Sequence, residues 1–351
     1  MKIGITRLSG NITDKNRESV GNKEMIAIAN LLQKYSEVDI LTCKECCDCV
    51  HVDENYDINK YDCLLVVNDS TNMFGGCEIT TMTTIYKLLH KFDKQIYYIL
   101  TDLSLPFVDY YELIKNKKWN NYNEYDFKLK NDIIILSQAY NLDIVKKIHK
   151  NIKYKDVIYI PFQEWKVFTE KIIDNNVPKK VDLIYGGSFR TGRREKKFID
   201  YFFDKNNLDI LIYGNMKLSQ FKNVDGLKPP IFKGKIPNQM VLMANSTSLA
   251  TILLGDKNYN DNIVTLRFVE ALLSNVICFI DNDFDTKHRL LDDYFYVNNG
   301  KELEEKIIEI QNDNMLYYSL LSKQQAKLLE ILNNNLPLKL FEVLERNNIW
   351  K

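Results

Sequence analysis

Apolar residues along the chain fall into short runs that alternate with amphipathic stretches, a pattern typical of proteins in which strands and helices alternate. In the first half, apolar runs predict strands at Lys2 to Thr6, Val38 to Leu41, Cys63 to Asn68, Gln95 to Thr101, Asp132 to Leu136 and Asp156 to Ile160. Helical periodicity covers Lys23 to Lys34, Ile79 to Phe92 and Leu142 to Lys150. This alternation predicts a parallel sheet covered by helices on both faces.

A second series of the same kind begins after a polar stretch, Asp174 to Lys180, whose proline and asparagines predict a linker. Its strands are predicted at Val181 to Tyr185, Asp209 to Tyr213, Ser248 to Leu254 and Val276 to Ile280, and its helices at Arg193 to Phe203, Thr265 to Leu273 and Lys301 to Gln311. The last stretch, Met315 to Trp350, predicts two helices separated near Pro337. The fold class is therefore α/β, with two doubly wound domains facing each other across a ligand-binding cleft.

Composition narrows the class of protein. A chain of 351 residues, 45% of them hydrophobic, is long enough to form two cores. Basic and acidic side chains balance at 47 each, which argues against a protein that coats nucleic acid by bulk charge, so any anion site must be local. The chain lacks a signal-peptide pattern and an apolar run of about 18 residues. We therefore expect a soluble, cytoplasmic protein without membrane contact.

Four of the seven cysteines crowd together at Cys43, Cys46, Cys47 and Cys49, with His51 close behind. Their spacing could suit zinc, but structural zinc sites usually have two separated ligand pairs, and the second pair is missing here. Reduced thiols in a loop are the favoured interpretation, and a disulfide framework does not fit the expected compartment.

The stretch from Val181 to Lys197, VDLIYGGSFRTGRREKK, joins a strand, a glycine pair and a helix start. The strand ends at Gly186-Gly187, and the helix begins close to Arg190, Arg193 and Arg194. Free backbone N–H groups and the positive end of the helix dipole favour an anion at such a turn. Arginines add forked donors for phosphate oxygens. The pattern predicts a phosphate site, and the alternative is a solvated basic helix start.

Polar residues follow several other predicted strands, where ligands of parallel sheets bind. In the first series these are Asn68 to Ser70 and, after the next strand, Thr101 and Asp102. In the second series the helix after the GDKNYNDN segment carries Arg267 and Glu270, three residues apart on one face. The arginine suits a diphosphate and the glutamate two ribose hydroxyls, while the alternative is an ordinary ion pair within the helix.

Several longer runs occur together, in one order and with characteristic spacing. They are VVN and NMFGG (Val66 to Gly76), IYYILTDLSLPF (Ile96 to Phe107), IYGGSFRTGRRE (Ile184 to Glu195), GKIP (Gly234 to Pro237), GDKNYNDN (Gly255 to Asn262), TLR (Thr265 to Arg267) and FDTKHR (Phe284 to Arg289). In combination they closely resemble the DNA β-glucosyltransferase of T-even bacteriophages. The resemblance extends from Met1 to about Asn299 and is weak over Ser9 to Gly21, over Thr42 to Asn59 and in the last fifty residues.

The resemblance implies a GT-B glycosyltransferase that acts as a monomer. It would transfer glucose with inversion from UDP-glucose to 5-hydroxymethylcytosine, a hydroxymethylated pyrimidine, in duplex DNA. Residues 1–173, joined by a C-terminal helix at 338–351, would form the acceptor domain that binds DNA. Residues 181–335 would form the domain that binds the UDP-sugar.

The same resemblance implies roles for individual residues. Asp102 would be the general base, and Glu24 would lie near the sugar and the acceptor. Arg190, Arg194 and Arg267 would bind the diphosphate, and Glu270 the ribose. The full set implied for the donor is Ser188, Arg190, Arg194, Tyr213, Gly214, Gly234, Lys235, Ile236, Tyr259, Arg267 and Glu270, with the backbone of Gly234 to Ile236 at the uracil.

DNA would be bound by a loop and a basic patch. The loop contains Met73, Phe74, Gly75 and Gly76, in which Phe74 would enter the base stack after the target base flips out. The patch contains Lys115, Lys117 and Lys118. The chain departs from the family at Met73, where the family has an aromatic residue, although methionine can also act as a wedge.

A second departure concerns the metal. The family places an acid where this chain has Gln163. Mg²⁺ or Mn²⁺ therefore stays an open question, and no metal ligand is assigned.

Two other classes stay open from the sequence. One is a glycosyltransferase of the same fold with another UDP-sugar, another hydroxymethylated base or an acceptor other than DNA. The other is a binding module without catalysis, against which the presence of both Asp102 and the arginines argues.

Overall fold

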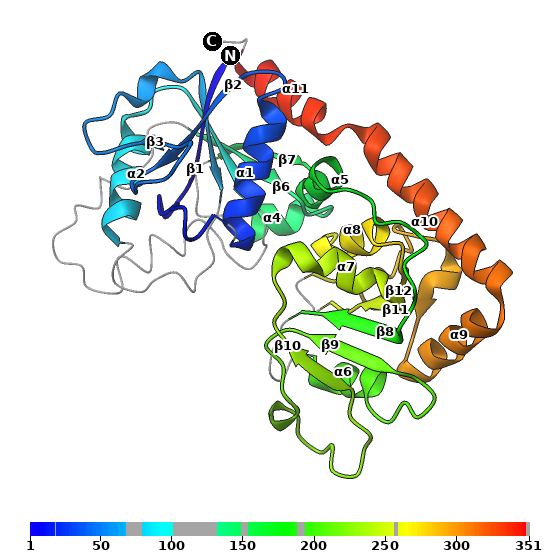
Figure 1. The fold of residues 1–351 in the computed structure, drawn as a ribbon. Helices are drawn as coiled ribbons and strands as arrows, with labels where there is room; N and C mark the ends of the chain where they lie inside the picture. Colours follow the sequence, from blue (N-terminus) through cyan, green and yellow to red (C-terminus); the bar gives the residue numbers. More distant parts are fainter. Residues whose placement is uncertain are drawn as a thin grey trace. The chain divides into compact units, whose positions relative to one another are not determined.

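The computed structural model describes residues 1–17, 19–67, 79–100, 132–148, 154–187, 194–255 and 259–348. The chain forms two compact units, and the first comprises Met1–Trp165 together with Asn335–Lys351. The second comprises Lys166–Asn334. Each unit has its own parallel sheet (Figure 1).

The first unit contains a seven-stranded parallel sheet among its described residues, in the order β3-β2-β1-β4-β5-β6-β7. Its strands are β1 (Lys2–Arg7), β2 (Glu37–Thr42), β3 (Val50–His51), β4 (Cys63–Val67), β5 (Gln95–Leu100), β6 (Ile133–Ser137) and β7 (Tyr154–Tyr159). Every residue of β4, β5 and β6 is buried, as expected for central strands covered on both faces.

Helices cover both faces of this sheet because the chain adds strands on one side of β1 (β2, β3) and on the other side of β4 (β5, β6, β7). α1 (Val20–Leu32) connects β1 to β2, and α2 (Ile79–Lys91) precedes β5 on the other side. Right-handed crossovers place these two helices on opposite faces. α4 (Leu142–Ile148) connects β6 to β7.

The end of the chain completes the first unit. α11 (Leu336–Asn348) packs beside α1 (Figure 1). The Tyr97 hydroxyl of β5 donates a hydrogen bond to the Leu344 carbonyl at 3.2 Å. Phe341 of α11 stacks on Tyr35, which follows α1, with ring centroids 5.4 Å apart. These contacts between residues more than 240 positions apart attach the C-terminal helix to the N-terminal sheet.

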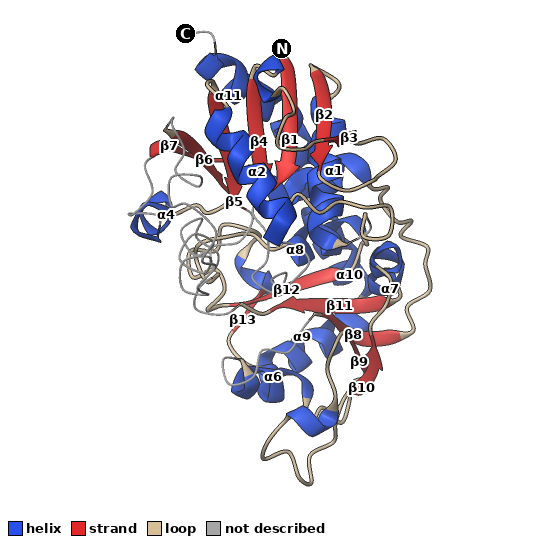
Figure 2. Cartoon of the chain, turned by 90° about the vertical axis from the view of Figure 1, so that its left-hand side faces the viewer, coloured by secondary structure: helices blue, strands red, loops and turns tan. Residues whose placement is uncertain are grey.

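The second unit contains a six-stranded parallel sheet among its described residues, in the order β10-β9-β8-β11-β12-β13. Its strands are β8 (Val181–Gly186), β9 (Ile210–Tyr213), β10 (Ile231–Gly234), β11 (Ser248–Leu253), β12 (Ile277–Asp281) and β13 (Tyr296–Val297). Its helices are α6 (Glu195–Phe202), α7 (Val241–Ser246), α8 (Leu266–Leu273), α9 (Gly300–Asn312) and α10 (Asn314–Asn334), and the short α5 (Trp165–Thr169) begins at the end of the first unit. α6 and α9 cover one face of the sheet, and α7, α8 and α10 the other (Figure 2).

The predicted class, two doubly wound α/β domains, is confirmed by these two sheets. The prediction missed β3, β10 and β13, which are strands of two to four residues at sheet edges. The predicted break near Pro337 between the last two helices is confirmed. The break lies at Asn335, whose φ is +48°, and Pro337 lies in the first turn of α11, where a missing N–H costs nothing.

The predicted linker lies along the second unit. Lys179 donates hydrogen bonds from Nζ to the carbonyls of Ser246 (2.9 Å) and Asn275 (3.1 Å), which end α7 and follow α8. Burial lowers the pKa of Lys179 to about 8. A cation among helix C-terminal carbonyls is favourable, but desolvation opposes its charge.

The depressed pKa of Lys179 predicts a pH-dependent stability. The folded state disfavours the protonated amine, so this destabilising contribution is complete below about pH 8 and disappears as pH rises toward the ordinary value of 10.5. Relative to Lys179→Met, the wild type should therefore gain free energy of unfolding between pH 7.5 and 9.5 in urea titrations. Lys171→Met, at an exposed lysine, is the control. A difference between wild type and Lys179→Met that stays constant with pH would contradict this assignment.

Candidate functional site

The second unit has a topological switch point between β8 and β11. α6 leads from β8 outward to β9, whereas α8 leads from β11 in the opposite direction to β12. The connections diverge at the carboxyl ends of these two central strands, and ligands of doubly wound sheets bind at such points.

Three backbone segments meet at this edge without intervening side chains. Gly187 N–H donates to the Tyr213 carbonyl at 3.0 Å, and Gly214 N–H donates to the Gly234 carbonyl at 2.9 Å. Gly214 has a φ of +135°, and a Cβ at this position would lie 1.7 Å from the Gly187 carbonyl oxygen. Only glycine allows this approach, which is how backbone groups come close to a ligand.

Two predicted arginines meet at one buried phenol. Arg267 of α8 donates from Nη1 to the Tyr185 hydroxyl at 2.5 Å, and its guanidinium lies 4.8 Å from the centre of the tyrosine ring. Arg194, at the start of α6, reaches the same hydroxyl at 3.5 Å and the Leu254 carbonyl at 3.1 Å. Two cations held this close, one of them 9% exposed, favour a polyanionic ligand between them.

Glu270 lies one turn beyond Arg267 on α8, but the two do not pair with each other. Its Oε1 accepts from Lys166 Nζ at 2.5 Å, and both residues of this ion pair are buried. The alternative of an ion pair within the helix was therefore wrong. Each residue has a partner far away in the sequence.

The start of α6 is also held from β12, which lies beyond β11 in the sheet. Lys197 forms ion pairs of 2.6 Å with Asp281, which ends β12, and with Asp283. Burial raises the pKa of Asp281, although the ammonium of Lys197 opposes that shift. This pair and the Arg194 contact attach the arginine-bearing end of α6 to the carboxyl ends of β11 and β12.

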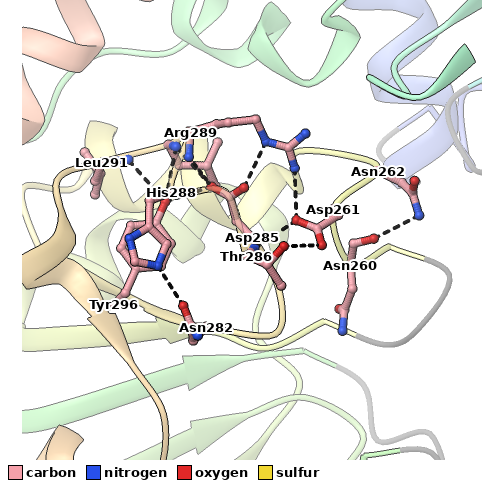
Figure 3. Close-up of polar contacts among 11 residues, drawn as sticks. Asn260, Asp261, Asn262, Asn282, Asp285, Thr286, His288, Arg289, Leu291 and Tyr296 are labelled. Carbon is pink, nitrogen blue, oxygen red and sulfur yellow. Dashed lines mark hydrogen bonds and ion pairs between the residues drawn. The ribbon is translucent and has the colours of Figure 1, made fainter.

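The loop that contains Tyr259 is held by a polar network (Figure 3). Asp261, with a φ of +59°, accepts from Thr286 N (2.8 Å) and Oγ1 (2.6 Å) and pairs with Arg289 at 3.3 Å. Asp285 is 2% exposed and accepts from Arg289 Nε at 2.9 Å and from the Tyr296 hydroxyl at 2.7 Å (Figure 3). Hydrogen bonds and an ion pair from Asp261 therefore join the GDKNYNDN run to the FDTKHR run.

The remaining described donor residues lie at the same edge of the sheet. Tyr213 ends β9 and Gly234 ends β10 with a φ of +74°. Lys235 is exposed and Ile236 half-buried in the segment that follows β10. A backbone segment of this kind can present N–H and C=O groups to a planar base.

The first unit has its own switch point, between β1 and β4. Arg7, at the end of β1, donates to the fully buried Asn22 at 2.9 Å, which holds the first turn of α1. Glu24 lies two residues after Asn22 on this helix and is 7% exposed. Asp102 comes two residues after Leu100, where the neighbouring β5 ends.

Some predicted site residues lie outside the described residues. They are Asp102, Ser188, Arg190, Met73, Phe74, Gly75, Gly76, Lys115, Lys117 and Lys118. Their assignments stay predictions.

The cysteine cluster lies between β2 and β3. The sulfur atoms of Cys46 and Cys49 are 2.8 Å apart, and Cys47 donates to Asp14 at 3.3 Å. Burial raises the pKa of Cys43 and of Cys49 to about 12, so both are protonated thiols at neutral pH. Within the described ranges, no group of three or more His, Cys, Asp and Glu side chains is arranged to hold a metal ion.

Two residues at the site were missed from the sequence. Tyr185 could have been noticed because it alternates with the buried Leu183 on β8, which aims its side chain at a covered face. Lys166 lies between apolar residues in WKVF, and a lone lysine there has no distinguishing pattern.

Comparison with solved structures shows which class of protein has this fold and site. T4 phage BGT in complex with UDP and Mn²⁺ matches with a TM-score of 0.86 and 35% identity, covering 98% of this chain and 99% of that one. T4 phage BGT in complex with its UDP-glucose substrate matches with a TM-score of 0.85 at the same identity and coverage. The two Rossmann-like domains and these matches define a GT-B glycosyltransferase.

The particular family follows from the sequence. The chain is 39% identical over 333 residues to the DNA beta-glucosyltransferase of Enterobacteria phage T4, covering 92% of this chain and 93% of that protein. Residues 1–166 match the family model for bacteriophage T4 beta-glucosyltransferase. The chain belongs to this family, and the predicted resemblance is confirmed.

The approach of Gly214 to Gly187 predicts a specific sensitivity. Gly214→Ala would force a Cβ against a backbone carbonyl at a positive φ, so it should destabilise the second unit by about 3 kcal/mol or more. Gly186→Ala, one residue before Gly187, meets nothing within 4 Å and should change stability by less than about 1 kcal/mol. Thermal unfolding of both variants checks the contrast, and equal stability would disprove the close approach.

Proposed function

We propose that this chain transfers glucose from UDP-glucose, with inversion, to the hydroxymethyl group of 5-hydroxymethylcytosine in duplex DNA. The second unit would bind the donor, and the first unit, with its C-terminal helix, would bind the acceptor. The observation that carries the donor half is the pair of arginines, Arg194 and Arg267, at the switch point between β8 and β11. Family membership supports the acceptor half.

The arginines suit the leaving group of this reaction. When the bond between glucose and UDP breaks, negative charge accumulates on the diphosphate. Preorganised guanidinium groups stabilise that charge more in the transition state than in the ground state, which lowers the barrier. Arg190, by resemblance, would add a third guanidinium, and Ser188 a hydroxyl. Tyr259, Tyr213, Gly214 and the backbone of Gly234 to Ile236 would enclose the uridine.

The acceptor half requires a base and an extruded nucleotide. Asp102 would remove the proton of the hydroxymethyl group as its oxygen attacks the anomeric carbon from the face opposite UDP. Glu24 would contact the sugar or the acceptor. Flipping the base costs a few kcal/mol, and Phe74, with Met73, would fill the space it leaves.

A divalent cation is compatible with this scheme, although no group of three or more His, Cys, Asp and Glu side chains in the described ranges could hold one. A relative binds UDP together with Mn²⁺. Mg²⁺ or Mn²⁺ on this chain would draw most of its ligands from the diphosphate and from water. In the described part of the chain, no helix is both long and apolar enough to cross a membrane.

The decisive test is transfer of labelled glucose from UDP-glucose to duplex DNA that contains 5-hydroxymethylcytosine. Unmodified duplex should accept none. Asp102→Asn should lower kcat by about 10²- to 10⁴-fold because the general base is lost. Asp143→Asn, at an aspartate whose side chain is 92% exposed on α4, is the matched control and should retain full activity.

Two outcomes would contradict parts of the proposal. Unchanged transfer by Asp102→Asn would remove that residue from the mechanism. Absence of transfer by a wild type that still binds UDP would retain the donor site and point to another acceptor or UDP-sugar.

DNA binding by this electrically neutral chain should depend on a local patch. Replacing Lys115, Lys117 and Lys118 together by glutamine should reduce the slope of log affinity against log salt by about 2 to 3, because each phosphate contact releases counterions. Fluorescence anisotropy with duplex DNA at several salt concentrations measures the slope. Lys301→Gln, at an exposed lysine of α9, is the control. An unchanged slope in the triple variant would place the DNA elsewhere.

A further inference from the structure

Lys166 and Glu270 form an ion pair that stability alone does not explain. Lys166 is 4% exposed and Glu270 8%, and their atoms Nζ and Oε1 are 2.5 Å apart. Taking two charges out of water carries a desolvation penalty that their attraction often fails to repay. Apolar residues of similar size would often be as stable. A buried ion pair at the edge of the sheet where ligands bind therefore indicates a role in ligand binding for one of its charged groups.

Only one of the two carboxylate oxygens of Glu270 takes part in this ion pair. Oε1 accepts from Lys166, whereas Oε2 makes no hydrogen bond within the described ranges. The Glu270 side chain keeps 11% of its surface exposed. Arg267, one turn earlier on α8, contacts Tyr185 at the end of β8. The second oxygen is thus available on the helix that also supplies an arginine to the site.

Resting on the proposed function, we propose that Lys166 is a positioning residue that sets the preference for a ribonucleotide donor. It holds one oxygen of Glu270, which fixes the rotamer of the carboxylate. The other oxygen then accepts a hydrogen bond from the 2′-hydroxyl of the ribose. A deoxyribonucleotide lacks that hydroxyl and would leave a charged, nearly buried oxygen without a partner, which is how polar sites reject such analogues.

The test compares the affinities of UDP and 2′-deoxy-UDP by titration calorimetry. The wild type should prefer UDP by about tenfold or more. Lys166→Met should lower that preference to about threefold or less. The affinity for UDP should fall, while the affinity for 2′-deoxy-UDP should change little. Lys166→Arg retains a cation and should recover part of the preference. Lys171→Met, the same substitution at an exposed lysine five residues later, should behave like the wild type.

Because Lys166→Met leaves a buried carboxylate unpaired, its folding is checked by thermal unfolding, and two further variants accompany it. Glu270→Gln should also lose the preference. The double variant Lys166→Met with Glu270→Gln removes the unpaired charge and should show no greater loss than either single variant, because the two residues act as one unit.

The outcomes separate this inference from the proposed function. If Lys166→Met lowered the affinities for UDP and 2′-deoxy-UDP equally, the role of Lys166 would be purely structural. That result would overturn the inference and leave the donor assignment standing. Full preference in Glu270→Gln would overturn it as well. A wild type that binds neither nucleotide would overturn the donor assignment together with the inference.

Discussion

The backbones of Gly187 and Gly214 approach so closely that no side chain fits between them, and the site of the second unit depends on this approach. Three neighbouring strands, β8, β9 and β10, end at this point, joined by hydrogen bonds among Gly187, Tyr213, Gly214 and Gly234. Their ends are bare backbone, so a ligand can reach N–H and C=O groups directly. Side chains from the helices then supply charge around this base.

Those charges are held by groups that lie on other elements. The Tyr185 hydroxyl contacts both arginines, and Lys166 holds Glu270. Lys197 and Asp281 fasten the start of α6 to the sheet. Fixed donors lose little freedom when a ligand binds, and they need not reorganise as charge develops in a reaction. In the proposed reaction, this rigidity would serve the groups that stabilise the leaving diphosphate.

The fold could be predicted in large part because the signal for it is local. Short apolar runs such as CLLVV and QIYYIL are typical of central strands, and both are strands buried throughout. The predicted helices between such strands began and ended within a few residues of the observed ones. β3, β10 and β13 could not be predicted because a strand of two to four residues at an edge depends on its neighbour for its existence. Asn335 ended α10 before Pro337 through a left-handed conformation that Pro337 itself does not signal.

By itself the sequence determined the alternating strands and helices, the glycine turn after β8 and, through several long runs in one order, the family. The tertiary structure decided which charges pair. A spacing of three residues placed Arg267 and Glu270 on one helix face and made an ion pair between them plausible. Their actual partners, Tyr185 and Lys166, lie 82 and 104 positions away in the sequence. Pairing at such separations follows from the packing of strands and helices, which no local pattern encodes.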